Sequence, residues 1–129
     1  MNKSDSGQAL IILIFALALA ITILAGVTLA AITLSKNIYL TETAQTAYLG
    51  AESGAEYALM KLIRDPSSCT GLTEDLAIDS AAVTLNYNLS GTTCTISIES
   101  QLANVLKKLQ LQAQISGGRV TFCCWKEQP

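Results

Sequence analysis

The feature that most constrains this chain is a long uncharged stretch close to its amino terminus. No charged residue occurs between Asp5 and Lys36, and residues 9–34 are apolar apart from scattered threonines. An α-helix rises about 1.5 Å per residue, so about 20 apolar residues cross the hydrocarbon core of a bilayer. The stretch predicts a membrane-spanning helix, which we assign to residues 8–35.

A cleaved secretory signal peptide is the main alternative for this segment, because it also places an apolar run near the amino terminus. Signal peptides have an apolar core of about 7–15 residues followed by a small-residue cleavage site. The run here is longer and continues without a proline into a second helical pattern. A retained, single-span anchor is therefore the better interpretation.

The second helical pattern follows directly and is amphipathic. Apolar residues recur at steps of three and four from Leu40 to Ile63, which is the spacing of one helix face. Pro66 disfavours helical geometry at Asp65, so the helix should end near Arg64. We predict one nearly continuous helix from Ala9 to Arg64, with residues 36–64 as its amphipathic half.

Small residues mark two parts of this helix. Alanine is a good helix former, but Gly50 and Gly54 are poor ones, which favours a tightly packed seam over simple helix propensity. Small side chains let another backbone approach closely, although they are also common in membrane helices. The predicted packing residues are Ala16, Ala20, Gly26 and Ala30 in the apolar half, and Ala44, Ala47, Ala51, Ala55 and Ala58 in the amphipathic half.

Period-two alternation begins near Val83, after a turn-rich segment of residues 66–80 that we read as a loop. It recurs in four stretches linked by turn signals such as Gly117-Gly118, which predicts an antiparallel meander with one apolar face. The amphipathic helix is the candidate cover for that face. The predicted fold is α+β: a long N-terminal α-helix packed on a small four-stranded antiparallel β-sheet, with residues 65–129 forming the sheet head.

Four cysteines follow the apolar segment: Cys69, Cys94, Cys123 and Cys124. In an oxidising compartment disulfides would support a domain this small, so disulfides are favoured over free thiols, with the pairing left open. The spacing lacks the CxxC pattern of zinc sites, so no metal is expected. Strand alternation predicts that Cys124 faces the helix with Phe122, and that Cys123 faces away with Trp125.

The composition argues against several classes of function. The sequence has no histidine, which removes the common catalytic dyads, and no phosphate-binding glycine motif. The net charge is −2 and no basic stripe is present, so nucleic-acid binding has no electrostatic support. We expect neither an enzyme nor a cofactor-binding protein.

A short polar leader ending in Gly7, a long apolar helix, an amphipathic extension and a small antiparallel sheet together resemble type IV pilins. The apolar segment and Ala51-Glu52-Ser53-Gly54-Ala55-Glu56 are most similar to PilX-like minor pilins and K-type minor pseudopilins. The similarity is strongest over residues 1–64, and beyond them it is one of architecture alone.

This resemblance implies that residues 1–7 are a prepilin leader, which a prepilin peptidase removes between Gly7 and Gln8. The protein would lie in the bacterial inner membrane with its C-terminal domain outside the cytoplasm, and then enter a surface or periplasmic filament. Its partners would be other pilin or pseudopilin subunits, the peptidase, an inner-membrane assembly platform and lipid. The alternative is a single-pass anchored extracytoplasmic interaction protein that never enters a filament.

Two positions depart from the usual pilin pattern. Gln8 stands where most pilins have Phe or Met, and Ile12 stands where most have a glutamate. That glutamate is thought to neutralise the new amino terminus of a neighbouring subunit, and an unpaired charge in an apolar core costs several kcal/mol. A subunit without the glutamate suits a tip or low-copy position better than a bulk repeat.

Overall fold

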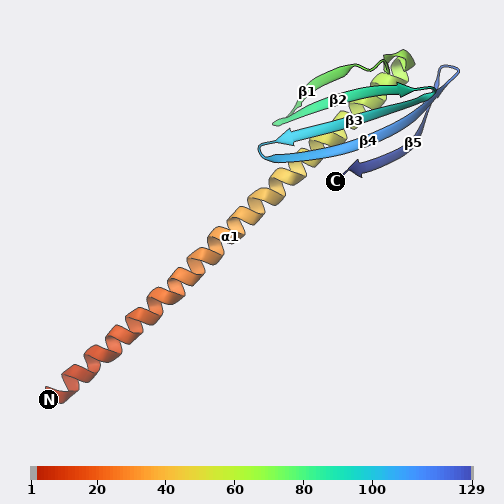
Figure 1. Ribbon diagram of the computed structural model, residues 1–129. Helices are drawn as coiled ribbons and strands as arrows, with labels where there is room; N and C mark the ends of the chain where they lie inside the picture. Colours follow the sequence, from red (N-terminus) through yellow and green to blue (C-terminus); the bar gives the residue numbers. More distant parts are fainter. Residues whose placement is uncertain (1–2, 129) are drawn as a thin grey trace. The chain divides into compact units, whose positions relative to one another are not determined.

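The computed structural model describes residues 3–128, and Figure 1 labels their helix and strands. By its internal contacts the chain divides into two units between Leu40 and Thr41. Helix α1 spans Lys3–Arg64 and is followed by a short 3₁₀ turn, η1, at Pro66–Ser68. The strands that follow are β1 (Thr73–Ile78), β2 (Ala81–Ser90), β3 (Thr93–Leu102), β4 (Val105–Ser116) and β5 (Arg119–Gln128).

The first unit is the apolar part of α1. Its side chains from Gly7 to Leu40 are all exposed. The hydroxyls of Thr22, Thr28 and Thr33 donate to backbone carbonyls of the preceding turn, at distances of 2.8–2.9 Å. Because each hydroxyl is satisfied within the helix, the threonines do not oppose burial of this segment in an apolar environment.

Helix α1 ends at Arg64, as its sequence predicts. Asp65 adopts extended geometry before Pro66, and its carboxylate accepts hydrogen bonds from the backbone and hydroxyl of Ser67. These bonds, the hydroxyl bond foremost, lower the pKa of the Asp65 carboxyl. The acidic residue therefore caps η1 and turns the chain towards the sheet.

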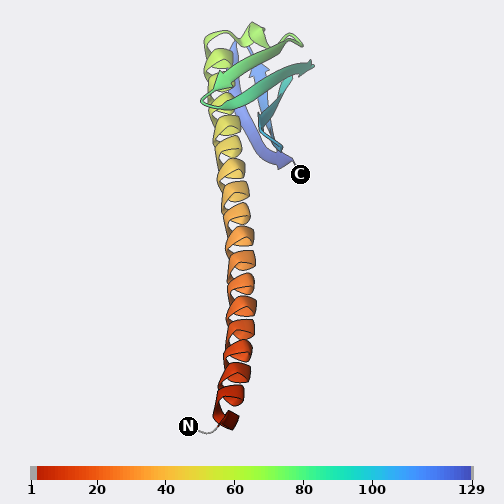
Figure 2. The ribbon, with the colours of Figure 1, turned by 90° about the vertical axis from the view of Figure 1, so that its left-hand side faces the viewer.

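The second unit packs the end of α1 against a five-stranded antiparallel sheet in the order β1-β2-β3-β4-β5 (Figure 2). Each connection is a tight turn that contains a residue of positive φ: Asp79, Gly91, Ala103 and the Gly117-Gly118 pair. Two consecutive positive φ angles are the signature of a type I′ hairpin turn, which Gly117-Gly118 provides. The sheet is thus a meander, and its two edges are β1 and β5.

The number of strands differs from the four that alternation predicts. Strand β1 lies in the segment predicted to be a loop, and its residues Glu74, Leu76 and Ile78 are the half-buried positions. An acidic residue at the first of these positions hides the apolar alternation. Glu74 is accommodated there because Lys61 of α1 pairs with it at 2.6 Å.

The seam between α1 and the sheet depends on small residues. Ala47, Ala51, Ala55 and Ala58 are fully buried there, and Ala44 is half-buried. A Cβ atom on Gly54 would lie 2.7 Å from Cγ1 of Val83, and one on Gly50 would lie 2.8 Å from Oγ of Ser100. Both distances are shorter than van der Waals contact, so these glycines set how closely the helix approaches the sheet.

The faces predicted for the C-terminal cysteines are wrong because β5 contains a β-bulge. Ala113 pairs with Phe122 and Gln112 pairs with Cys124, which leaves Cys123 without an opposite residue. Directly opposite residues share a face of the sheet. Cys124 therefore lies on the outer face with Gln112, and Trp125 lies opposite the buried Leu111 on the helix side.

Candidate functional site

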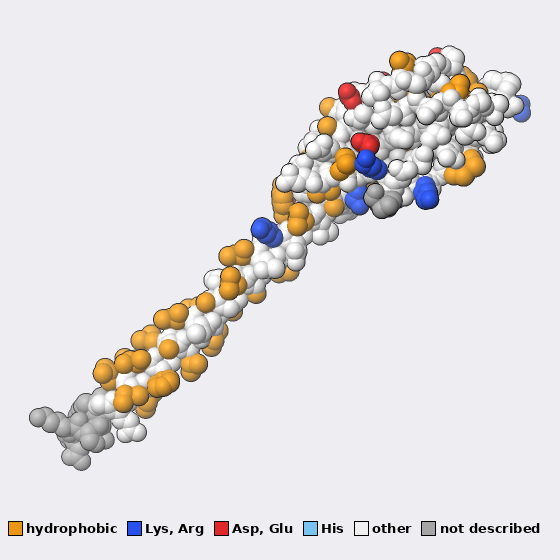
Figure 3. Space-filling view, viewed as in Figure 1, with side chains coloured by type: hydrophobic (Ala, Val, Ile, Leu, Met, Phe, Trp, Pro, Cys, Tyr) orange, Lys and Arg blue, Asp and Glu red, His pale blue; other side chains and the backbone are white. Residues whose placement is uncertain are grey.

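The part of α1 in the first unit exposes apolar side chains along its length, and no described residue packs against them. Large hydrophobic residues there, from Leu10 to Leu40, are each more than half exposed, with Phe15 at 68% and Ile21 at 65%. Figure 3 shows hydrophobic side chains along this whole segment. A water-soluble protein rarely exposes a contiguous apolar surface of this extent, so the segment requires an apolar cover.

Helix α1 meets the requirements for a single membrane span. Its most apolar window of 18 residues has a mean hydropathy of 3.0, and none of that window is buried within the protein. Within a bilayer a helix satisfies its own backbone hydrogen bonds, so the exposed apolar side chains are the only part that lipid must solvate. The segment is therefore compatible with one membrane crossing.

The small residues predicted for helix packing fall into two groups. Those of the amphipathic half lie in the seam with the sheet. Ala16, Ala20, Gly26 and Ala30 are exposed, and a Cβ atom on Gly26 would meet nothing within 4 Å. These four small residues leave low points on the surface of α1, which have room for the close approach of a neighbouring helix.

The predicted processing residues lie in the first part of α1. Gly7 and Gln8 are helical and exposed, and a Cβ atom on Gly7 would meet nothing within 4 Å. A side chain at position 7 is therefore compatible with the fold of the described chain.

A polar cluster fastens the end of α1 to strand β1. The Lys61 ammonium pairs with one Glu74 oxygen at 2.6 Å, and the Tyr57 hydroxyl donates to the other at 3.1 Å. Lys61 also lies 5.5 Å from the centre of the Tyr87 ring. The hydrogen bond between Lys61 and Glu74 is the main cause that raises the pKa of Lys61 and lowers the pKa of Glu74. Burial raises the pKa of Tyr87 to about 12, so this phenol stays neutral.

The four cysteines separate into two kinds. Cys69 and Cys94 form a disulfide, and both are almost completely buried. Cys123 and Cys124 are exposed thiols on β5 with their sulfur atoms 2.7 Å apart. The disulfide ties the segment after η1 to β3, at the end of the core.

No group of three or more cysteine, aspartate or glutamate side chains able to hold a metal ion occurs among the described residues. Three carboxylates of the described chain form ion pairs, each with a lysine on a neighbouring element: Glu74, Glu99 and Glu127. These pairs are structural contacts.

Sequence reasoning did not identify the Lys61–Glu74 pair or the adjacent sulfur atoms. The ion pair depends on strand β1, whose acidic residues interrupt the apolar alternation that identifies a strand. The contact between the sulfur atoms depends on the bulge at Cys123, which has no signal in the local sequence. The spacing of the two cysteines is visible in the sequence, but alternation predicts that they point apart. No known protein family, curated protein or solved structure matches this chain.

Proposed function

We propose that this protein is a minor pilin or pseudopilin, a tip or low-copy structural subunit of a type IV pilus or a type II secretion-like filament. One observation supports this most strongly: the first unit is a helix whose apolar surface is exposed over its full described length. Such a helix needs an apolar environment throughout the life of the protein. A membrane followed by a filament core supplies that environment in succession.

Transfer from lipid to filament changes the polarity around leucine and isoleucine very little. Association of apolar helices must then gain its free energy from close packing. The surface positions Ala16, Ala20, Gly26 and Ala30 support this step, because their small side chains leave room for a neighbouring helix. The partners in this proposal are membrane lipid first and other pilin-like subunits afterwards.

Processing after Gly7 would precede assembly. A prepilin peptidase would remove residues 1–7 and leave Gln8 as the charged amino terminus. Ile12 offers no carboxylate to a neighbour's amino terminus, which favours a low-copy position over repeated use along the shaft. An inner-membrane assembly platform would then move the subunit out of the bilayer.

The Cys69–Cys94 disulfide supports an extracytoplasmic location for the second unit, because disulfides persist mainly in oxidising compartments. In the proposed topology the apolar part of α1 crosses the bacterial inner membrane. The sheet lies in the periplasm until assembly and afterwards on a surface or periplasmic filament.

The decisive experiment measures the mature amino terminus by mass spectrometry in cells with and without a prepilin peptidase. We expect the chain to begin at Gln8 only when the peptidase is present. Gly7→Leu should abolish this processing and remove the protein from sheared filaments. Gly26→Leu is the matched control for processing, because it places the same side chain at an exposed glycine of α1 outside the processing site, and its chain should still begin at Gln8. Gly26 is also a predicted packing position, so this variant is compared for processing and not for recovery in filaments.

A chain that begins at Met1 in both strains would overturn the proposal. A processed or unprocessed chain that stays in the membrane, and is never recovered in filaments, would instead identify an anchored extracytoplasmic interaction protein.

A further inference from the structure

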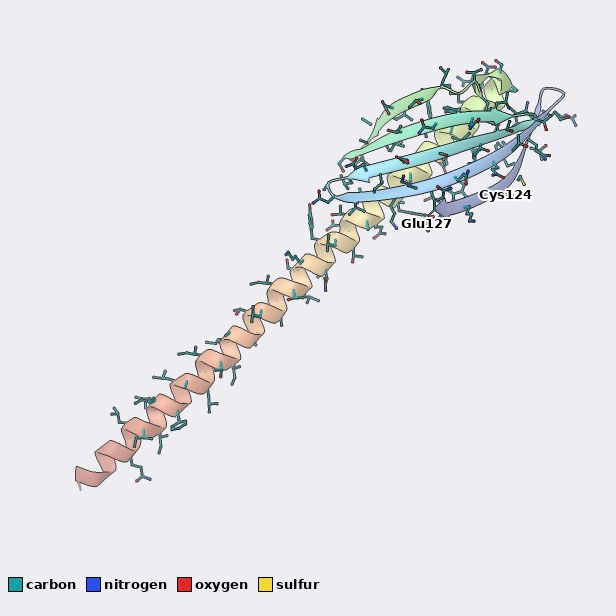
Figure 4. All side chains as sticks on the ribbon, in the orientation of Figure 1. Cys124 and Glu127 are labelled. Atoms are coloured by element: carbon teal, nitrogen blue, oxygen red, sulfur yellow. A yellow bond between two sulfur atoms is a disulfide. The ribbon has the colours of Figure 1, made fainter. Side chains whose placement is uncertain are left out.

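The exposed cysteines of β5 form a site that the filament proposal does not use. Their Sγ atoms are 2.7 Å apart, which is closer than ordinary van der Waals contact between two sulfur atoms. A disulfide bond measures about 2.05 Å, so the thiols need to approach by less than an ångström to bond. Figure 4 places Cys124 on β5, at the edge of the sheet.

The β-bulge explains why these sulfur atoms meet. In a regular strand adjacent side chains point to opposite faces, and neighbouring cysteines stay apart. Cys123 is the extra residue of the bulge and lacks an opposite partner on β4, whereas Cys124 pairs with Gln112. The local bend of the bulged strand turns the Cys123 side chain towards its neighbour.

We propose that Cys123 and Cys124 form a redox-active vicinal dithiol, which closes reversibly to an intrachain disulfide by exchange with an external low-molecular-weight disulfide. The thiolate of one of the two cysteines attacks one sulfur of the external disulfide, forms a mixed disulfide and expels a thiolate. The other cysteine then loses its proton and attacks the protein sulfur of the mixed disulfide, which releases the second thiolate. Two protein thiols are oxidised, and one external disulfide is reduced to two thiols.

The surroundings of the pair favour this chemistry. Cys124 lines an open hollow on the outer face together with Gln110, Gln112 and Lys126, so a small disulfide can reach it. The Lys126 ammonium favours negative charge in that hollow, including a departing thiolate. A hydrogen bond with the Cys123 side chain is the main cause that raises the pKa of the Cys124 thiol, which reflects how closely the two sulfur atoms lie.

Reversibility follows from the adjacency of the two residues. Consecutive Cα atoms lie about 3.8 Å apart across a trans peptide, below the roughly 4.4–6.8 Å usual for disulfides. A ring closed over that distance is strained, and strained, exposed disulfides are the readily reduced ones. Cys69–Cys94 differs on both counts, because it is buried and joins residues far apart in sequence.

The test uses the full chain purified in detergent and incubated with oxidised glutathione, then alkylated and digested with trypsin. Cleavage after Arg119 and Lys126 gives a peptide of residues 120–126 that contains both thiols. We expect this peptide to lose two hydrogen atoms in mass and to become resistant to alkylation. Reduced glutathione at moderate excess should restore both thiols while Cys69–Cys94 stays closed.

A dithiol-bridging arsenical provides a second readout. Phenylarsine oxide should bind the reduced chain with one arsenic per molecule and resist displacement by a monothiol. Cys123→Ser and Cys124→Ser should each abolish this retention. The matched control, Gln128→Cys combined with Cys123→Ser, keeps two exposed thiols on β5. It separates them by about 13 Å, because Gln128 pairs with Lys108 and Cys124 with Gln112, so it should neither retain the arsenical nor close a ring.

Three results would overturn the inference. They are a peptide that carries two stable glutathione adducts, covalent dimers as the main oxidised product, and two thiols that remain free after oxidation. Equal retention of the arsenical by the control variant would also contradict it. None of these results depends on whether the chain enters a filament.

Discussion

The ammonium of Lys61 on α1 lies 2.6 Å from a carboxylate oxygen of Glu74 on β1, and this ion pair fixes an edge strand to the last turns of the helix. The lysine side chain is 35% exposed and the glutamate 26%. Partial exposure to solvent weakens such a pair, so its contribution is modest. The pair also neutralises Glu74, which lies at a half-buried position of β1 beside the core.

Replacement of Glu74 by glutamine should lower the free energy of unfolding by about 0.5–1 kcal/mol at neutral pH. The pairing lowers the pKa of Glu74, so its stabilisation is present above the ordinary value of 4.5 and is lost as the pH falls through the lower folded value. Denaturant unfolding in detergent at several pH values measures this. Glu74→Gln should weaken the fall of the unfolding free energy at acidic pH. Glu52→Gln, at a position without an ion pair in the described chain, should leave that pH dependence unchanged.

Replacement of Gly54 by alanine should destabilise the second unit by about 1–3 kcal/mol, because the new methyl group would overpack the seam. Its Cβ would lie 2.7 Å from Cγ1 of Val83, a short branched side chain that has little room to move. Gly26→Ala is the matched control, since open space surrounds it.

The same seam allows a double-mutant cycle. Val83→Ala should recover part of the stability lost in Gly54→Ala, because it removes the methyl group that clashes. Thermal unfolding followed by circular dichroism gives the coupling energy. Additive effects of the two substitutions would show that the helix does not contact the sheet at this point.

Loss of the Cys69–Cys94 bridge should lower the unfolding free energy by about 2–4 kcal/mol, through the freedom that the unfolded chain regains. The paired variant Cys69→Ala/Cys94→Ala avoids a single leftover thiol in the core. Unfolding curves of this variant and of the parent, with and without reductant, measure the effect. The variant Cys123→Ser/Cys124→Ser should unfold like the parent, and equal losses in both pairs would contradict the assignment.

A charge in the middle of the apolar segment should weaken membrane retention. Arginine at the centre of a spanning helix costs about 2.5–3.5 kcal/mol on insertion scales. Ile21→Arg should therefore shift protein from the membrane pellet to the soluble or aggregated fraction after alkaline extraction. Leu72→Arg changes a similarly exposed apolar residue outside the helix and should leave the distribution unchanged.

The long helix and the antiparallel sheet could be predicted from the sequence because their signals are local. The periodicities from Leu40 and from Val83 report directly on which residues face the core, and Pro66 marks where the helix ends. Strand β1 could not be recognised, because Glu74 occupies an inward position that only a distant lysine makes tolerable. The alternation rule predicted the wrong faces from Cys123 onward because β5 contains a bulge. A bulge is defined by how two strands pair, so the sequence of β5 alone does not reveal it.

The apolar surface of α1 could be predicted, and no described residue of the chain covers it. Residues such as Ala16 and Gly26 carry no contact within the described protein, so their use as packing positions stays a prediction. The thiols of Cys123 and Cys124 could not be predicted to meet, although both residues are visible in the sequence. Their sulfur atoms come together through the bulged pairing of β4 with β5.

Cys123 is in effect a single inserted residue in β5. On either side of it the pairing with β4 continues, through Phe122 opposite Ala113 and Cys124 opposite Gln112. Deletion of the Cys123 codon would therefore give a regular strand in which Phe122, Cys124 and Trp125 keep their present partners on β4. A lineage could gain or lose this reactive pair in one mutational step without rebuilding the sheet.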